Sequence, residues 1–448
     1  MFRTTVPARR LRRNRLARNF AFSLAVAGMG AAGMTALAAP AHAADKNKQD
    51  ASEGKPQYTK AFVEAYKPLQ DVVNKATDAA SAEPGRALVQ PMVAAIANDD
   101  DRMAGGSILL QLGLKLNDKE LQQQGLTMQL DSGKVPADKQ AVFNYYVGGM
   151  AWDKKDYATA SKYLGKAYEL GYRENDIDWL VGETYFQQNQ NAQGLAALKQ
   201  MEQADEAAGK SLSEKAMRAA LKAAYDAKDT AQIADWAAMV AQHYPRPDIW
   251  NIALSVVRDS YDLQPDEALD LYRLMRLTGS LKTKQDYVYY VDSADARKLA
   301  NEVMPVLQEG ISKGLLNASD AYVADNLQVA KTNAPSDRSG ADQMAKDART
   351  AANGIAARAA GDNYLAIGEP AKAVEMYQLA AQKGGVEADR TQMRIGVAQA
   401  QAGNYDAARQ SFQQVTGKRQ PVAKMWLAYL ASKQAPAAAA APAAAPAQ

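Results

Sequence analysis

The sequence predicts an all-α fold built from stacked helical hairpins. Apolar residues recur with the 3.6-residue period of a helix through most of the chain, and no stretch alternates apolar and polar residues as a strand would. Turn signals interrupt this pattern roughly every 12 to 18 residues, which is the spacing of short helices joined by tight turns. Examples of these breaks are Asn117–Asp118, Lys154–Asp156, Asn189–Asn191, Lys228–Asp229 and Gly403–Asn404. Alanine is abundant, whereas the chain of 448 residues holds only 7 Phe and 5 Trp. Alanine, Leu, Gln and Lys favour helix.

The first 43 residues are typical of a signal peptide, removed after Ala43. Seven arginines and no acid precede an apolar stretch, which ends at the small-x-small cleavage site Ala41–Ala43. Paired arginines leave the general secretory and the twin-arginine export routes both open. We therefore expect an exported, periplasmic protein whose only membrane contact is through the uncleaved leader.

Removal of the leader reverses the charge of the chain. The whole sequence has 53 basic and 50 acidic residues, and seven of the basic residues lie in the leader, so the mature chain carries a net charge of −4. A mature protein of this charge lacks the electrostatic footprint of a nucleic-acid binder. Cysteine is absent, so neither a disulfide nor a lipoprotein anchor can form.

Two polar or repetitive segments flank the predicted fold. Residues 44–57 are polar and charged, and residues 433–448 are dominated by Ala and Pro. We expect both segments to be disordered, because neither can bury enough apolar surface to offset the entropy of ordering. The folded part is therefore placed at residues 58–432.

Small and large residues recur at fixed distances within this folded part. Gly148 and Gly182 are 34 residues apart, as are Leu164 and Leu198. A second set recurs 35 residues later: Gly361, Gly368, Ala373, Tyr377 and Ala380 return as Gly396, Gly403, Ala408, Phe412 and Val415. Such periods are the signature of a repeat architecture, in which each hairpin buries its apolar face against its neighbours.

This pattern resembles the tetratricopeptide repeat. The best copy contains the motif residues Gly396, Gly403, Tyr405, Ala408 and Phe412. The resemblance is clear over residues about 140–206 and 354–417. Elsewhere the copies are degenerate, and residues 280–353 either continue the solenoid or form an unrelated helical insert. The resemblance to the tetratricopeptide repeat implies a right-handed superhelix, in which the first helix of each repeat lines a concave groove.

Aromatic residues mark one part of the predicted groove. If the register of the family applies, Tyr145 and Trp152 occupy groove positions around Gly148, and Trp179 and Phe186 occupy the same positions around Gly182. Aromatic side chains anchor peptides or stack on sugar rings. The groove site is therefore predicted to consist of these four aromatics with three polar neighbours: Asp153, Glu183 and Gln187. The alternative is that the aromatics form part of the core.

Motifs for catalysis, cofactors or metals are lacking. His243 is the only histidine after the leader, and its position before Pro245 is typical of a helix end, where a positive charge is favourable. One His and no Cys exclude the usual zinc, iron and copper sites. We therefore expect a non-catalytic scaffold without a cofactor, which binds a protein or peptide partner of the cell envelope. The alternatives are a glycan- or cell-wall-polymer-binding protein and, more remotely, a glycan-cleaving enzyme with paired carboxylates.

Overall fold

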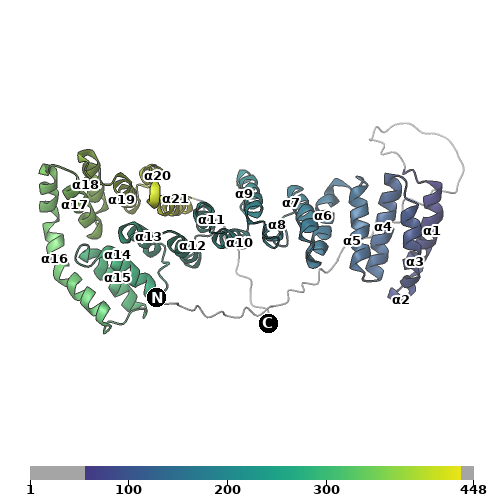
Figure 1. Ribbon diagram of the computed structural model, residues 1–448, viewed down its shortest axis with the longest axis horizontal. Coiled ribbons are helices and arrows are strands. Elements are labelled where there is room, and N and C mark those ends of the chain that lie inside the picture. The colour runs from purple at the N-terminus through teal and green to yellow at the C-terminus, as the bar shows by residue number, and fades with distance from the viewer. Residues whose placement is uncertain (1–55, 435–448) are drawn as a thin grey trace, which may run out of the picture. The chain divides into compact units, whose positions relative to one another are not determined.

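The structure, a computed structural model, describes residues 56–434 (Figure 1). Within this range every regular element is a helix, which confirms the predicted all-α class. The predicted signal peptide 1–43, nearly all of the lead-in 44–57 and most of the tail 433–448 lie outside the described residues. No helix between residues 56 and 434 is long and apolar enough to cross a membrane.

The chain divides into two compact units, and the division falls after Tyr146. The first unit contains α1 (Lys60–Lys75), α2 (Ala79–Ala82), η1 (Glu83–Gly85), α3 (Arg86–Ala94), α4 (Asp99–Lys115) and α5 (Lys119–Asp131). Helix α6 (Ala137–Asp153) spans the division. The core of the first unit is built by Phe62, Leu69, Met92 and Leu109, all with essentially no exposed surface.

The second unit is a series of helical hairpins. Its helices are α7 (Tyr157–Glu169), α8 (Ile177–Phe186), α9 (Asn191–Ala207), α10 (Glu214–Asp226), α11 (Thr230–His243), α12 (Pro247–Ser260), α13 (Pro265–Leu277), α14 (Lys284–Ala294), α15 (Ala300–Ser312), α16 (Ala321–Thr350), α17 (Ile355–Ala366), α18 (Pro370–Lys383), α19 (Ala388–Gln401), α20 (Tyr405–Gln413), η2 (Gly417–Arg419) and α21 (Gln420–Gln434). Consecutive helices pack against one another through most of the unit, as expected of a solenoid.

A glycine on the first helix of a hairpin contacts a large residue sixteen positions later on the second helix. A Cβ atom at Gly182 would lie 2.6 Å from the Leu198 side chain, and one at Gly396 would lie 2.6 Å from the Phe412 ring. The same relation holds for the pairs Gly148–Leu164 and Gly361–Tyr377. The small residue therefore lets the two helix backbones approach, which is the physical cause of the repeat seen in the sequence.

The turns between helices lie at the predicted breaks. Asn117, Lys155, Asn189, Lys228 and Gly403 all have positive φ angles between 49° and 81°. This left-handed conformation ends a helix by reversing the chain, and Gly and Asn tolerate it best. The predicted breaks are thus confirmed as helix ends.

Residues 280–353, left open by the sequence, continue the helical array. Helices α14 and α15 form a further hairpin, and the 30-residue helix α16 packs on both α15 and α17. At the other end, α21 extends to Gln434, two residues into the segment assigned to the tail. In these last two residues, Lys433 lies over the Tyr429 ring and the Gln434 amide donates to the Asp406 carboxylate at 3.4 Å.

Helix α21 returns to the middle of the second unit and packs against α11 (Figure 1). The Trp426 indole N–H donates to the Asp270 carbonyl oxygen at 3.0 Å, and Lys424 forms an ion pair with Asp235 at 2.5 Å. These partners are 156 and 189 residues apart in sequence. The segment from α11 to α21 therefore closes on itself.

Candidate functional site

Two of the predicted groove aromatics lie together and are partly exposed. The Trp152 and Trp179 rings meet edge to face, with centroids 5.9 Å apart, and Tyr157 approaches Trp152 in the same way at 5.2 Å. The Lys215 ammonium lies 3.4 Å from the centroid of the Trp179 ring, on one face of the indole. Three consecutive first helices, α6, α8 and α10, therefore contribute to one surface.

The other two predicted aromatics belong to the packing between helices. Tyr145 is only 2% exposed, so its assignment as a partner-binding residue is corrected to a core residue. It lies in the middle of α6, about 60° around the helix from the packed face of Gly148, whereas Trp152 lies in the last turn. Phe186 is half-buried, because its ring packs where a Cβ of Gly194 would lie 2.5 Å away. Phe186 therefore packs mainly on α9 of its own hairpin.

The three polar residues of the prediction lie near this surface without forming a defined site. Asp153 is exposed at the end of α6. The Gln187 side-chain amide donates to the Glu183 carboxylate at 2.6 Å, one helical turn away. This local pair satisfies both side chains but does not by itself select a ligand.

The same surface continues into a hollow of about 610 Å³ along α10 and α12. Tyr225, which is 46% exposed, lies in its wall, and Ile252 and Val256 supply the apolar side from α12. Sequence reasoning did not identify Tyr225 as a groove residue. The available signal was an aromatic residue on the first helix of a hairpin. We call this surface the α10 groove, which is formed by Trp179, Lys215, Arg218, Leu221, Lys222, Tyr225, Ile252 and Val256.

The cations of the α10 groove are held by ion pairs that are exposed or partly exposed. Lys215 binds Asp176 at 2.8 Å, and Arg218 binds Glu214 at 3.3 Å. Lys222 pairs with Asp226 one turn further along the same helix. Exposed pairs of this kind contribute at most about 1 kcal/mol, so a ligand can exchange them at little cost.

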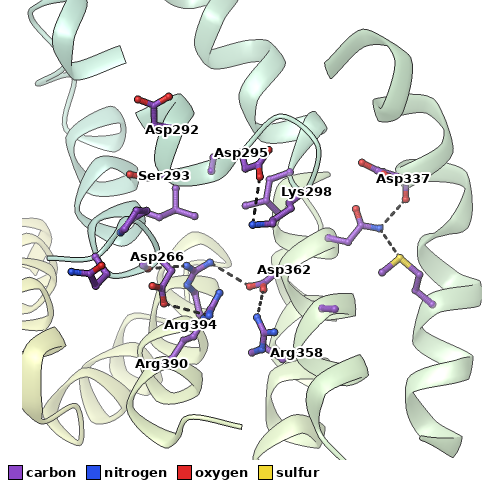
Figure 2. A pocket seen from close by; sticks show the side chains of 18 residues that line it. Asp266, Asp292, Ser293, Asp295, Lys298, Asp337, Arg358, Asp362, Arg390 and Arg394 are labelled. Carbon is purple, nitrogen blue, oxygen red and sulfur yellow. Dashed lines mark hydrogen bonds and ion pairs between the residues drawn. The ribbon is translucent and has the colours of Figure 1, made fainter. Parts of the chain in front are cut away.

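A larger cavity of about 850 Å³ lies inside the closed segment (Figure 2). Its walls come from α13, the α14–α15 connection, α16, α17 and α19. Most of its charges are paired with one another. Arg394, with an almost completely buried side chain, binds Asp270 at 3.0 Å and Asp362 at 3.3 Å, while Arg358 binds the other oxygen of Asp362 at 3.1 Å.

Two groups in this cavity are less well compensated. Arg390 binds Asp266 at 3.3 Å, but its buried Nε–H has no hydrogen-bond acceptor. Burial and the positive charge of Arg394 lower the pKa of Arg390. Burial also raises the pKa of Asp337, which lies across the cavity from the arginines in Figure 2. The cavity could therefore hold a small ligand with both an anionic and a cationic group.

A separate polar cluster surrounds His243, which is the last residue of α11, as expected from the sequence. Glu202 and Glu206 of α9 approach its Nε2 atom with one oxygen each, at 3.2 and 3.6 Å. Burial raises the pKa of Glu202 to about 7 and lowers the pKa of His243. Sequence reasoning considered His243 alone, because its partners are about forty residues distant in the chain.

Comparisons with known proteins find likeness only among solved structures. No family model and no curated protein matches the sequence. The Naa15/Naa10 complex bound to HypK-THB is similar over 80% of this chain, at 11% identity and a TM-score of 0.35, and the match spans 60% of that chain. A tetratricopeptide repeat protein from Parabacteroides merdae is matched over 99% of its length and 65% of this chain, at 9% identity and a TM-score of 0.23.

A third similar structure is the tetratricopeptide repeat domain of P58(IPK), at 10% identity and a TM-score of 0.23. The match covers 83% of this chain and 98% of that domain. Because these TM-scores are below 0.5, the assignment of the fold rests on the helices and on the repeated glycine contacts described above. These features define an all-α helical-repeat protein.

Proposed function

We propose that this protein is a non-catalytic scaffold that binds a segment of a protein partner along the α10 groove. The observation that carries the proposal is the exposed Tyr225 ring beside the apolar hollow between α10 and α12. Exposed aromatics that border an apolar depression are typical anchors of protein recognition. The occupant that fits is a peptide segment with a bulky apolar side chain for the hollow.

The charges around the hollow favour a segment that also carries acidic residues. Lys215, Arg218 and Lys222 follow one another at intervals of three and four residues, so they lie along one face of α10. Two of their partners, Asp176 and Asp226, are exposed acids, which an incoming carboxylate can replace, whereas Glu214 is half-buried and also binds Arg246 at 2.8 Å. Such exchange adds selectivity more than affinity, because both the old and the new ion pair are solvated.

The alternative of a glycan ligand has less support in this groove. A sugar ring stacks on the open face of an aromatic ring. The Lys215 ammonium covers one face of Trp179, and this ring also meets the Trp152 ring edge to face. A stacked sugar would have to displace these contacts, whereas a peptide side chain can enter the neighbouring hollow without doing so.

The place of action in this proposal is the bacterial cell envelope. The basis is the predicted leader of residues 1–43, with its seven arginines, apolar stretch and cleavage site. Fractionation of cells that produce the untagged protein tests this part. Recovery of a shortened chain beginning near Ala44 in the periplasmic fraction is the expected result, and a full-length chain in the cytosol would contradict it.

Site-specific photo-crosslinking tests the groove. A photoreactive phenylalanine analogue is placed at Tyr225 and, as a matched control, at Tyr289 of α14, which is 42% exposed and lies outside the groove. We expect a crosslinked protein partner from position 225 and not from position 289. Mass spectrometry of the crosslinked peptide then identifies the bound segment.

A binding measurement with the identified segment completes the test. Tyr225→Ala should weaken binding by roughly tenfold or more, which is the effect expected of an aromatic anchor, while Tyr289→Ala should leave the affinity unchanged. Both variants must retain the melting temperature of the wild type. Equal crosslinking from both positions, or unchanged affinity of Tyr225→Ala, would overturn the proposal.

A further inference from the structure

The three side chains of Glu202, Glu206 and His243 converge on a single point between α9 and α11. Glu202 and Glu206 are one helical turn apart, so they project from the same side of α9. The two carboxylates and the imidazole each contribute an atom to a group in which all ligand atoms lie within 4.8 Å of one another.

The two distances from His243 to the carboxylates are close to those between ligands of one metal ion. Zinc–nitrogen and zinc–oxygen bonds of about 2.0–2.1 Å at tetrahedral angles place neighbouring ligand atoms about 3.3 Å apart. The His243 Nε2 atom is 3.2 Å from the Glu202 Oε1 atom and 3.6 Å from the Glu206 Oε1 atom. The Glu206 side chain is 51% exposed, so it is free to rotate toward the other two ligand atoms.

Two buried atoms at the centre of the cluster lack partners. Neither the Glu202 Oε1 atom nor the His243 Nε2 atom forms a hydrogen bond, although they are close together and inaccessible to solvent. A buried polar atom without a partner is destabilising, because it has lost its hydrogen bonds to water and gained none in the protein. A cation between them would satisfy both at once, because each presents a lone pair when the imidazole is neutral and protonated on Nδ1.

The surroundings hold the ligands in place and leave their negative charge uncompensated. The Glu202 side chain is 1% exposed, and its other oxygen accepts the Leu212 backbone N–H at 2.7 Å, which fixes the carboxylate. The other charged groups that face Glu202 are acids: Glu206, Asp205 and Asp178. Among residues 56–434, the arginine or lysine that binds one of these acids is Arg173, which pairs with Asp205 and not with the cluster.

Solvent reaches the cluster from the side of Glu206. The side chains of Glu206 and His243 are 51% and 20% exposed, so an ion can enter and a water molecule can serve as the remaining ligand. One imidazole nitrogen and two carboxylate oxygens suit first-row transition metals such as Zn²⁺, whereas Mg²⁺ and Ca²⁺ prefer all-oxygen sites.

We propose that Glu202, Glu206 and His243 form a binding site for one divalent transition-metal ion, with Zn²⁺ as the best fit. The bound ion links α9 to α11, and both of these helices pack against α10. The site thus braces the helix that carries Lys215, Arg218 and Tyr225. The proposal does not depend on the identity of any ligand of the α10 groove.

Cobalt titration of the untagged full-length protein tests the site, after stripping with a chelator. We expect one equivalent of Co²⁺ to bind, with the visible absorption of a four- or five-coordinate ion, and Zn²⁺ to displace it while Mg²⁺ does not. Zinc should also raise the melting temperature of the wild type by at least about 2 °C, because it binds only the folded state.

Three variants locate the ion. His243→Gln should abolish the cobalt absorption. Glu206→Gln should weaken binding at least about tenfold, because loss of a residue that binds the metal directly lowers the affinity at least as much as loss of a residue that only supports such a ligand. Glu375→Gln, which changes an exposed acid on α18, should bind like the wild type. Glu206 is exposed, so its variant is expected to fold, and circular dichroism checks this. Absence of saturable binding to the wild type, or full binding by His243→Gln, would overturn the proposal.

Discussion

At the scale of single residues, Glu202 is a carboxylate placed where its charge is disfavoured. Its pKa of about 7 lies above the ordinary value of 4.5, chiefly because of burial and further because of the acids that face it: Glu206, Asp205 and Asp178. Below pH 4.5 the group is protonated in both the folded and the unfolded state and contributes no pH dependence. As pH rises from 4.5 to about 7, the unfolded chain releases the proton first, so the folded state loses stability. Above pH 7 this loss is complete.

Replacement of Glu202 by Gln removes this penalty. The amide oxygen can still accept the Leu212 N–H, and it stays neutral at every pH. In chelator, we expect Glu202→Gln to be more stable than the wild type at pH 8 by up to about 2 kcal/mol, allowing for partial solvation of the charge. The difference should vanish near pH 4.5. Urea unfolding at the two pH values measures it, and a variant less stable at pH 8 would show that Glu202 is compensated by its surroundings.

Residue positions also explain which part of the groove could be predicted. Trp152 and Trp179 lie together because the 34-residue repeat places equivalent positions of neighbouring hairpins side by side. The repeat does not show which part of a helix is covered by its neighbours and which part is open to solvent. This is why the sequence could not distinguish the buried Tyr145 from the half-exposed Trp152. Glu202 and His243 are not equivalent repeat positions, so the periodicity of the sequence does not predict that they lie close together.

At the scale of helices, each hairpin depends on close approach at one glycine. A methyl group added at Gly396 would lie 2.6 Å from the Phe412 ring, which is itself fully buried against the stacked Trp426 ring. Gly396→Ala should therefore destabilise the second unit by about 1–3 kcal/mol, the usual effect of overpacking a core. Thermal or urea unfolding measures the change.

Gly165 provides the matched control for this substitution. It also lies inside a helix, α7, but a Cβ atom there would meet no atom within 4 Å. Gly165→Ala should stabilise the protein by up to about 1 kcal/mol, because alanine loses less backbone entropy in a helix. Opposite signs for the two substitutions are the expected outcome. If Gly396→Ala also stabilised the protein, the helices would be able to separate without loss, and close approach would not determine the repeat.

At the scale of the whole chain, the sequence predicts the stacking of neighbours but not the closure of the second unit. Neighbouring hairpins are recognisable in the sequence by spacings of 34 and 35 residues. In the contacts of α21 with α11 and α13, Trp426 meets Asp270 and Lys424 meets Asp235 across 156 and 189 residues of sequence, and no local pattern encodes them. Trp426 and Arg394 both meet at Asp270, where the indole donates to the backbone oxygen and the guanidinium binds the carboxylate.

Closure should make the hairpins from α11 to α21 one cooperative block. Trp426 is completely buried, so Trp426→Ala removes a large side chain, leaves the Asp270 carbonyl oxygen without its indole donor and should cost about 3–5 kcal/mol. Because α21 packs on α11 and α13, we expect amide hydrogen exchange to accelerate in those two helices as well as in α21 itself. The α4–α5 pair belongs to the first unit and serves as an internal reference, where exchange should stay unchanged. Faster exchange confined to α21 would mean that the last helix covers the solenoid without stabilising it. Faster exchange in α11 and α13 as well would mean that the contacts made by α21 hold the unit together.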